Sequence, residues 1–176
     1  QLPPSRQSKE APQMIKNIFG KTGENVWVEA PFHCDYGWNI EVGENFYSNY
    51  NLTILDVGKV TCGKNVQIAP NVSIYTAGHP VHPDSRNSGY EYGIPVTVGD
   101  NVWIGGNTVI LPGVTVGSNV VIGAGSVVSK DIPDNTIAAG NPCKVIRKIT
   151  DEDRIYYFKK QKFDDEAWEE VKNKNK

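Results

Sequence analysis

The residues best suited to chemistry open an irregular stretch of the chain, Gly78-His79-Pro80-Val81-His82. A histidine is the side chain most easily set as a base near neutral pH, and Pro80 stiffens the backbone beside His79. Asn49 and Asp56, earlier in the chain, add an amide donor and a carboxylate. These residue types predict a site in which His79 accepts a proton.

The segments that must position these residues repeat with a period of six. An aliphatic residue recurs at every sixth position: Val98, Ile104, Ile110, Val116, Ile122 and Val128. Six fits neither the 3.6-residue period of a helix nor the two-residue period of a lone strand. It fits short strands that turn a corner and close a triangular coil every three strands. The repeat therefore predicts an all-β solenoid, a left-handed parallel β-helix with its aliphatic residues facing inward.

The same spacing occurs earlier in the chain. Two further series are Val42, Ser48, Ile54 and Cys62, Ile68, Ile74. The pattern then stops until Val98, which lies 24 positions after Ile74, a multiple of six. We therefore expect residues 78–95 to leave the solenoid as a loop, with the register kept. Asn49 and Asp56 would lie about one and a half coils before this loop, within reach of His79 in one subunit or across to a neighbour.

The ends of a solenoid need caps, because each coil buries its core only by stacking. Residues 1–25 form a polar segment with a short helix expected over Pro12–Phe19, and residues 26–149 form the β-helix. The string Thr150-Asp151-Glu152-Asp153 resembles a capping box. It predicts a helix through Tyr156, Tyr157 and Phe158 that covers the C-terminal end. The rest of residues 150–176 is a tail, with Lys172–Lys176 expected to be disordered.

Composition narrows the function classes. The net charge of −2 gives no reason to expect nucleic acid or an anionic membrane as partner. No apolar run approaches the roughly 20 residues of a membrane span, and residues 1–10 lack the apolar stretch of a signal peptide. Three cysteines without a paired motif fit reduced thiols in the cytoplasm. We expect a cytoplasmic protein of one domain.

Longer motifs resemble those of the hexapeptide-repeat acyltransferases, and within them the sugar O-acetyltransferases of the maltose and galactoside type. The matching strings lie over about residues 15–160: Cys34-Asp35-Tyr36-Gly37, Asn45-Phe46-Tyr47, Asn51-Leu52-Thr53, Ile68-Ala69-Pro70-Asn71-Val72, Gly78-His79-Pro80-Val81-His82, Asn101-Val102-Trp103-Ile104-Gly105, Gly123-Ala124-Gly125-Ser126-Val127-Val128, Lys130-Asp131-Ile132-Pro133 and Gly140-Asn141-Pro142-Cys143-Lys144-Val145-Ile146-Arg147. The run from Trp103 to Arg147 is the part most specific for CoA-dependent acyl transfer.

The resemblance implies a homotrimer with three active sites, each in a groove between neighbouring subunits. It implies acetyl-CoA as the acetyl donor, a sugar hydroxyl as the acceptor, direct transfer with His79 as general base, and no metal. Asn49 matches a residue that steadies the oxyanion. The acceptor side would comprise Asp35, Tyr47, Asn49, Asp56 and Tyr92. The donor side would comprise Trp103, Gly105, Gly106 and Ala124 beside the pantetheine arm, and Ser129, Lys130, Lys144 and Arg147 near the nucleotide.

Other interpretations stay open. Related enzymes carry a longer helical segment before the point matching Met14, so we expect a fragment or an edited chain and a weakened acceptor side. Another acceptor, such as an antibiotic, an oligosaccharide or a nucleotide sugar, is the first alternative. A zinc hydration site of the carbonic anhydrase type on His33, His79 and His82 is the second. A non-catalytic scaffold is the third. Each proposed site residue could also have a purely structural role, as a corner asparagine, a turn aspartate, a packed aromatic or a solvated lysine.

Overall fold

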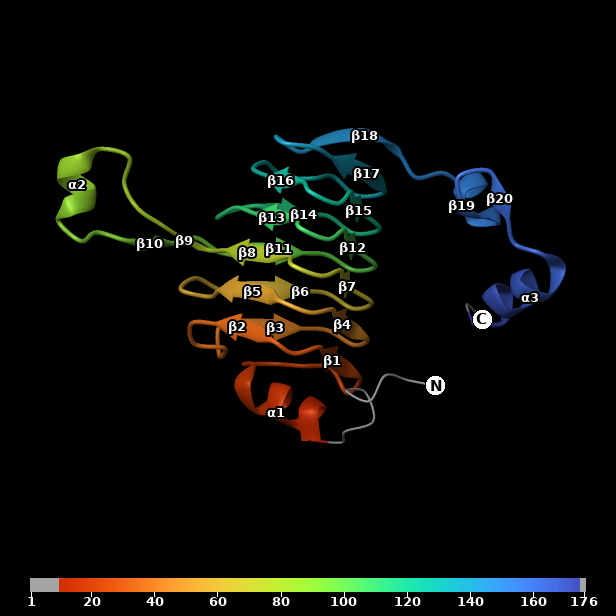
Figure 1. Ribbon diagram of the computed structural model, residues 1–176, viewed down its shortest axis with the longest axis horizontal. Coiled ribbons are helices and arrows are strands. Elements are labelled where there is room, and N and C mark those ends of the chain that lie inside the picture. Colours follow the sequence, from red (N-terminus) through yellow and green to blue (C-terminus); the bar gives the residue numbers. More distant parts are fainter. Residues whose placement is uncertain (1–9, 175–176) are drawn as a thin grey trace.

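The chain folds into a triangular column of stacked coils with one arm on either side (Figure 1). The computed structural model describes residues 10–174. Coil after coil adds a short strand to each of three sheets, which form the three faces of the column. We name these sheets A, B and C in the order in which the chain visits them from β3 onward, and each edge of the column by the two sheets that meet there.

The strands of each sheet come from successive coils and pair in parallel, except for the last strand of sheet B. Sheet A contains β3 (Ile40–Val42), β6 (Val60–Cys62), β11 (Val96–Val98) and β14 (Thr115–Val116). Sheet B contains β1 (Val26–Val28), β4 (Phe46–Ser48), β7 (Gln67–Ile68), β12 (Trp103–Ile104), β15 (Val121–Ile122), β17 (Thr136–Ala139) and the antiparallel β18 (Lys144–Lys148). Sheet C contains β2 (Phe32–Cys34), β5 (Leu52–Leu55), β8 (Ser73–Tyr75), β13 (Val109–Ile110) and β16 (Val127–Val128).

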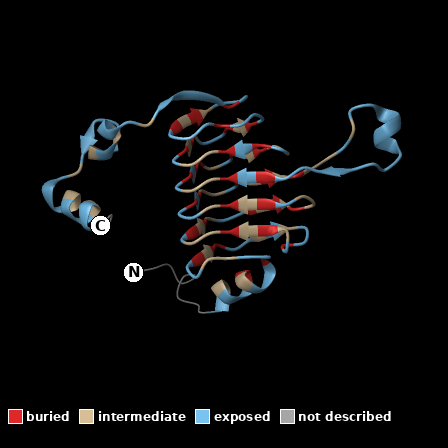
Figure 2. Ribbon diagram, turned by 180° about the vertical axis from the view of Figure 1, so that it is seen from behind, coloured by how far each residue is buried: buried red, intermediate tan, exposed pale blue. Residues whose placement is uncertain are grey.

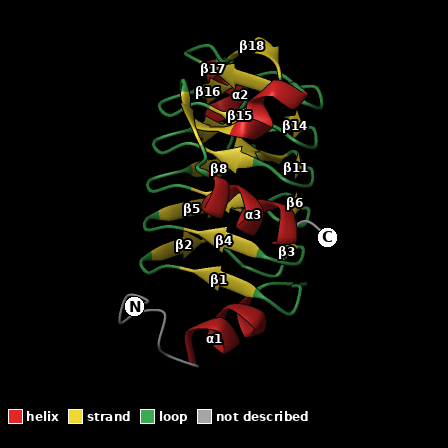
Figure 3. Cartoon of the chain, turned by 90° about the vertical axis from the view of Figure 1, so that its right-hand side faces the viewer, coloured by secondary structure: helices red, strands yellow, loops and turns green. Residues whose placement is uncertain are grey.

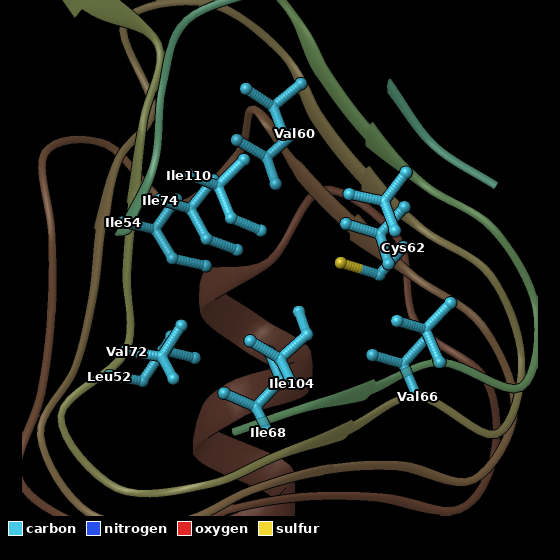
Figure 4. Packing of buried hydrophobic residues seen from close by; sticks show 14 of the residues in the cluster. Leu52, Ile54, Val60, Cys62, Val66, Ile68, Val72, Ile74, Ile104 and Ile110 are labelled. Carbon is cyan, nitrogen blue, oxygen red and sulfur yellow. The ribbon is translucent and has the colours of Figure 1, made fainter. Parts of the chain in front are cut away.

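The aliphatic residues of the repeat fill the column, as predicted. All six members of the series from Val98 to Val128 are at most 1% exposed. Each stacks on its counterpart in the coil below, as Ile110 does on Ile74 and Ile74 on Ile54, and Figure 4 shows these side chains pointing to the common axis. Buried residues are concentrated in the column, while both arms are largely exposed (Figure 2). The core is therefore held together by contact between coils.

The register is kept across the loop, which confirms that prediction. After the loop, β11 pairs with β6 of the preceding coil, with Val96 opposite Val60 and Val98 opposite Cys62. The loop itself contains β9 (Ala77–Gly78), α2 (Pro83–Asn87) and β10 (Tyr92–Gly93). Strands β9 and β10 pair antiparallel at its root. The loop thus projects from the C–A edge as an arm (Figure 1).

Asparagines with left-handed backbone turn the corners of the A–B edge. Five of them have φ between 56° and 58°: Asn45, Asn65, Asn101, Asn119 and Asn135. Asparagine tolerates this conformation better than most residues with a side chain. From Asn25 to Asn135, each side-chain amide donates to the amide oxygen of the next, over 2.8–2.9 Å. We call this row the amide ladder.

The N-terminal end of the column is covered by a short helix. Helix α1 (Glu10–Ile18) lies beneath the first coil (Figure 3), and Ile15 and the following Phe19 are buried against the core. The prediction of a helix here is confirmed. No helix in the described residues 10–174 is long and apolar enough to cross a membrane.

The C-terminal end differs from the expectation. The capping box at Thr150 is present, but it starts only a 3₁₀ helix, η2 (Asp151–Ile155). Tyr156–Phe158 then form a strand, β19, which pairs with β20 (Gln161–Lys162), so the prediction of a helix there is wrong. Consecutive aromatic residues favour a strand over a helix. The end of the column is closed by β17 and β18 instead.

The tail also differs from the expectation of disorder. Helix α3 (Asp165–Lys174) includes the described part of that segment, and residues 175–176 lie outside the described residues. Trp168 of α3 stacks on Phe163, which contacts Tyr157 of the hairpin. Hairpin and helix thus form a small unit of their own beside the column, the C-terminal arm (Figure 1).

Candidate active site

His79 lies at the root of the loop, exposed, directly after β9. Its ring Nδ1 is 3.1 Å from the carbonyl oxygen of Tyr90. Because a carbonyl oxygen can only accept, this contact places the ring proton on Nδ1 and leaves the lone pair on Nε2. His79 is therefore set as a proton acceptor at Nε2.

The opposite strand of the loop fixes the position of His79. Tyr92 pairs with Gly78 across the β9–β10 ribbon, and its ring lies against the glycine. A Cβ atom on Gly78 would stand 2.4 Å from the Tyr92 hydroxyl oxygen. Only glycine leaves room for this ring, which is 37% exposed at the surface next to the base.

Asp35 and Asp56 lie on the same edge of the column, between sheets C and A, but in different environments. Asp56 is fully buried, and its carboxylate accepts hydrogen bonds from the backbone N–H groups of Asp35, Tyr36 and Gly37 at 3.0, 3.0 and 2.7 Å. Asp35 is exposed. Desolvation and then the charges of Asp56 and Glu91 raise the pKa of the Asp35 carboxyl above its ordinary value. Asp56 holds the turn, and Asp35 faces solvent.

Asn49 lies on a different edge, between sheets B and C, directly after β4. Its side-chain Oδ1 accepts a hydrogen bond from the N–H of Tyr50 at 2.8 Å. That contact identifies the oxygen and leaves the amide Nδ2 to donate elsewhere. Tyr47, on β4, is half-buried on the outer side of sheet B. Asn49 therefore supplies a fixed N–H donor of the kind that stabilises an oxyanion.

Small residues follow Asn49 along the B–C edge. Gly105 is demanded by the stacking itself, since a Cβ atom there would be 2.5 Å from the backbone nitrogen of Ala124 in the next coil. Gly106 would meet the carbonyl oxygen of Pro70 at 3.1 Å. The stacking of coils therefore requires glycine at position 105, and position 106 has little space for a side chain.

Trp103 projects from sheet B and is 55% exposed. With Gln67, and with Lys174 at the end of α3, it lines a hollow of about 540 Å³. A tryptophan this exposed contributes little to the core, and its ring is accessible from solvent.

The four predicted nucleotide-side residues lie in two places. Ser129 and Lys130 follow β16 at the C–A edge, whereas Lys144 and Arg147 are exposed on β18. Arg147 already forms a bidentate pair with Asp153, at 2.7 and 2.6 Å. This pair and the Thr150 N–H hold the pKa of Asp153 well below its usual range. A phosphate on Arg147 would have to share the guanidinium with Asp153.

A second hollow, of about 690 Å³, lies beside Arg147. It is lined by Arg147, Lys148, Thr150, Glu152, Asp153, Tyr156, Lys159, Lys160 and Lys162. It contains no predicted acceptor-side residue, so it does not coincide with the surroundings of His79.

One copy of the chain does not bring the base and the amide donor together. His79, Asp35 and Tyr92 belong to the C–A edge, whereas Asn49 belongs to the B–C edge, and a strand of sheet C separates the two edges. Five extended residues span about 17 Å. These residues could not be assigned to edges from the sequence, because that assignment requires the order of the sheets.

Two further groups at the C–A edge were not predicted from the sequence. Tyr36 and Trp38 flank Gly37 and are exposed at the surface, and Glu91 lies close enough to Asp35 to affect its pKa. The aromatic residues around Gly37 were a usable signal, since exposed aromatics often mark binding surfaces. Within residues 10–174, no group of three or more His, Cys, Asp or Glu side chains is arranged to hold a metal ion, and His33, His79 and His82 form no such cluster.

Comparisons with known proteins agree with this architecture. Residues 95–130 match the family model described as bacterial transferase hexapeptide (six repeats). The galactoside O-acetyltransferase of Escherichia coli (strain K12) is 55% identical over 149 residues, which are 85% of this chain and 73% of that protein.

Two solved structures are similar in fold and in sequence. A galactoside acetyltransferase in complex with coenzyme A superimposes with a TM-score of 0.87 at 54% identity, over 93% of this chain and 81% of that one. A maltose O-acetyltransferase from Clostridium difficile 630 gives a TM-score of 0.80 at 56% identity, over 86% and 80% of the two chains.

Proposed function

Because this chain belongs to the hexapeptide-repeat acetyltransferases of the galactoside and maltose type, whose fold is the left-handed parallel β-helix, we propose that it transfers an acetyl group from acetyl-CoA to a hydroxyl of a sugar. The observation that carries the proposal is the geometry of His79. Its Nδ1 is engaged by the Tyr90 carbonyl, so Nε2 is free to accept the proton of an attacking hydroxyl.

The proposed reaction is a direct transfer. The sugar oxygen attacks the thioester carbonyl while His79 Nε2 takes the hydroxyl proton; the carbon–sulfur bond then breaks, and His79 returns the proton to the departing thiolate of CoA. No cysteine is set as a competing nucleophile. Burial raises the pKa of Cys34 and of Cys143, and raises that of Cys62 to about 12, so all three favour the unreactive thiol.

Asn49 would stabilise the tetrahedral intermediate of this reaction. The negative charge that develops on the carbonyl oxygen needs a fixed donor, and the Asn49 Nδ2 has that property because Tyr50 orients the amide. On the acceptor side, Tyr92 is the exposed group beside His79, and Asp35 is exposed on the same C–A edge. Tyr47 is proposed to contact the acceptor from sheet B. Asp56 is proposed to act indirectly, by holding the turn that carries Asp35.

Since Asn49 and His79 lie on different edges of one chain, the proposed site requires two copies. A homotrimer would place the C–A edge of one column against the B–C edge of the next and repeat that contact three times. Each of three sites would then combine His79 from one copy with Asn49 from its neighbour. The narrow B–C edge at Gly105, Gly106 and Ala124 would accommodate the pantetheine arm.

The remaining donor-side residues complete the proposal. Trp103 would pack on the pantetheine arm, and Ser129, Lys130, Lys144 and Arg147 would lie at the nucleotide end, where cations pair with phosphates. The CoA complex of the galactoside acetyltransferase supports this donor. The homologues named for galactoside and maltose support a sugar as acceptor.

Release of free CoA thiol from acetyl-CoA, measured with glucose, maltose, galactose, a galactoside and no sugar, tests the proposal. The wild type should release thiol only with a sugar, and His79→Ala should turn over roughly 10²–10⁴-fold more slowly with an unchanged KM for acetyl-CoA. His82→Ala is the matched control, because His82 lies in the same loop and caps α2 by accepting from the Asp84 N–H. An unchanged rate in His79→Ala refutes the base assignment, and saturable CoA binding without release means a different acceptor.

A further inference from the structure

The turn between β2 and β3 presents two aromatic rings to solvent on the C–A edge. Tyr36 and Trp38 are 48% and 66% exposed, with ring centroids 4.9 Å apart and planes inclined by 33°. We propose that this pair, the aromatic platform, binds the second ring of the acceptor, either the further sugar of a disaccharide or the aglycone of a glycoside. The inference rests on the proposed function in one respect, that the acceptor is a sugar.

The platform is held rigidly from both sides. Above it, the buried carboxylate of Asp56 binds three consecutive N–H groups of the turn. Below it, Gly37 has φ +84° and stands so close to Ile18 that a Cβ atom would lie 2.4 Å from the Ile18 Cγ2. A carboxylate is costly to bury unless it is hydrogen-bonded. Here it orders an exposed turn, and a ring ordered in advance loses little entropy when a ligand binds.

The chemistry of the turn fits a sugar ring. One face of a pyranose is lined with C–H groups that carry a slight positive charge, and the face of an aromatic ring is negative. The rim of a pyranose carries hydroxyl groups, which donate to carboxylates. Asp35 is exposed and directly precedes Tyr36, so the same turn carries apolar ring faces and a carboxylate acceptor.

The platform and His79 lie on the same edge of the column, the C–A edge, two coils apart. The turn that carries Trp38 follows β2, and the loop that carries His79 follows β8, two strands further along sheet C. Neighbouring strands are about 4.8 Å apart, so the two levels are about 10 Å apart. Glu91, on the same loop, is one of the charges that raise the pKa of Asp35. A ring on the platform would therefore be a neighbour of the acetylated ring, and not that ring itself.

The test compares one-ring and two-ring acceptors. The pairs are glucose with maltose and galactose with phenyl β-galactoside, and the proteins are the wild type, Trp38→Ala, Trp38→Phe and Tyr157→Ala. We expect Trp38→Ala to raise the KM for the two-ring acceptor about tenfold, the contribution of one aromatic contact. The KM for the one-ring acceptor, the KM for acetyl-CoA and kcat should stay within about twofold, and Trp38→Phe should recover most of the loss. Tyr157 is an exposed aromatic on the C-terminal arm, at 59% against 66% for Trp38, and its variant should match the wild type.

An equal effect on one-ring and two-ring acceptors, or no effect, overturns the inference while the proposed reaction stands. Calorimetric titration of the same sugars without acetyl-CoA distinguishes a failure of the platform inference from a failure of the proposed acetyl-transfer reaction. Two-ring binding that depends on Trp38 without thiol release supports the platform and refutes the reaction. Absence of two-ring binding by the wild type overturns the platform, as does a change of oligomeric mass in Trp38→Ala, which would make the pair a subunit contact.

Discussion

Replacing Asp56 with asparagine should lower the free energy of unfolding by about 3–5 kcal/mol. The carboxylate accepts from Asp35, Tyr36 and Gly37 through its two oxygens, at 3.0, 3.0 and 2.7 Å. The amide oxygen of asparagine can keep the first two, without the benefit of a charge. Its NH₂ group would face the N–H of Gly37, so the strongest bond is lost, at about 2 kcal/mol, and a buried donor is left without an acceptor, at about 1–3 kcal/mol.

Urea unfolding of wild type and Asp56→Asn, followed by circular dichroism at equal protein concentration, measures this change. With a slope of about 2 kcal/mol per molar urea, the midpoint should fall by about 2 M. Asp134→Asn is the matched control, because the exposed Asp134 also accepts from a backbone N–H, that of Ser118 at 2.7 Å. Its midpoint should move by less than about 0.5 M. Equal midpoints for the two variants would refute the assignment of Asp56 as the residue that holds the turn.

Three further predictions follow from particular side chains. Trp103→Ala should raise the KM for acetyl-CoA without lowering the melting temperature, because the ring is 55% exposed; a lower melting temperature with unchanged KM would show that it only packs. Gly37→Ala should cost more unfolding free energy than Gly89→Ala, since both have positive φ but only Gly37 has a neighbour, Ile18, within 4 Å of the added methyl; equal urea midpoints would contradict this. Burial raises the pKa of Cys62 to about 12 from 9.0, so above pH 9 the unfolded chain loses this proton while the folded chain keeps it, and stability should fall from pH 9 towards 12. Unfolding of Cys62→Val across this range should show a shallower fall, and identical slopes would contradict the burial argument.

The solenoid was predictable because its physics is local and repeated. Each coil needs small corners and an aliphatic residue every six positions, and the sequence from Val98 to Val128 meets that requirement without exception. The loop was predictable by arithmetic, from the 24 positions between Ile74 and Val98. The C-terminal arm was not, because the capping box at Thr150 and the aromatic run after it favour different structures, and contacts such as Phe163 on Trp168 decide between them.

The candidate site was predictable in residue type and only partly in arrangement. His79 could be selected from its irregular surroundings, but its hydrogen-bond partner Tyr90 lies eleven residues away across a hairpin that has no periodic signal. Asp56 resembled any other corner aspartate in the sequence. Its burial depends on the turn one coil below, and a position in one coil does not reveal what covers it. Tyr36 stood in a recognised string and Trp38 lies just after it, and the exposure of neither could be predicted from the sequence.

The amide ladder shows how freely the loop can vary. Its bond from Asn65 to Asn101 spans 36 residues of chain, while the bonds before and after it span 20 and 18, and all three are 2.8–2.9 Å long. The coils before and after the inserted loop therefore stack on each other as closely as coils that no loop separates. Insertions, deletions or whole exchanges within residues 79–91, beyond the β9–β10 pairing at the root of the loop, would leave the column intact. Evolution or protein engineering can therefore alter the segment that carries the base independently of the scaffold that supports it.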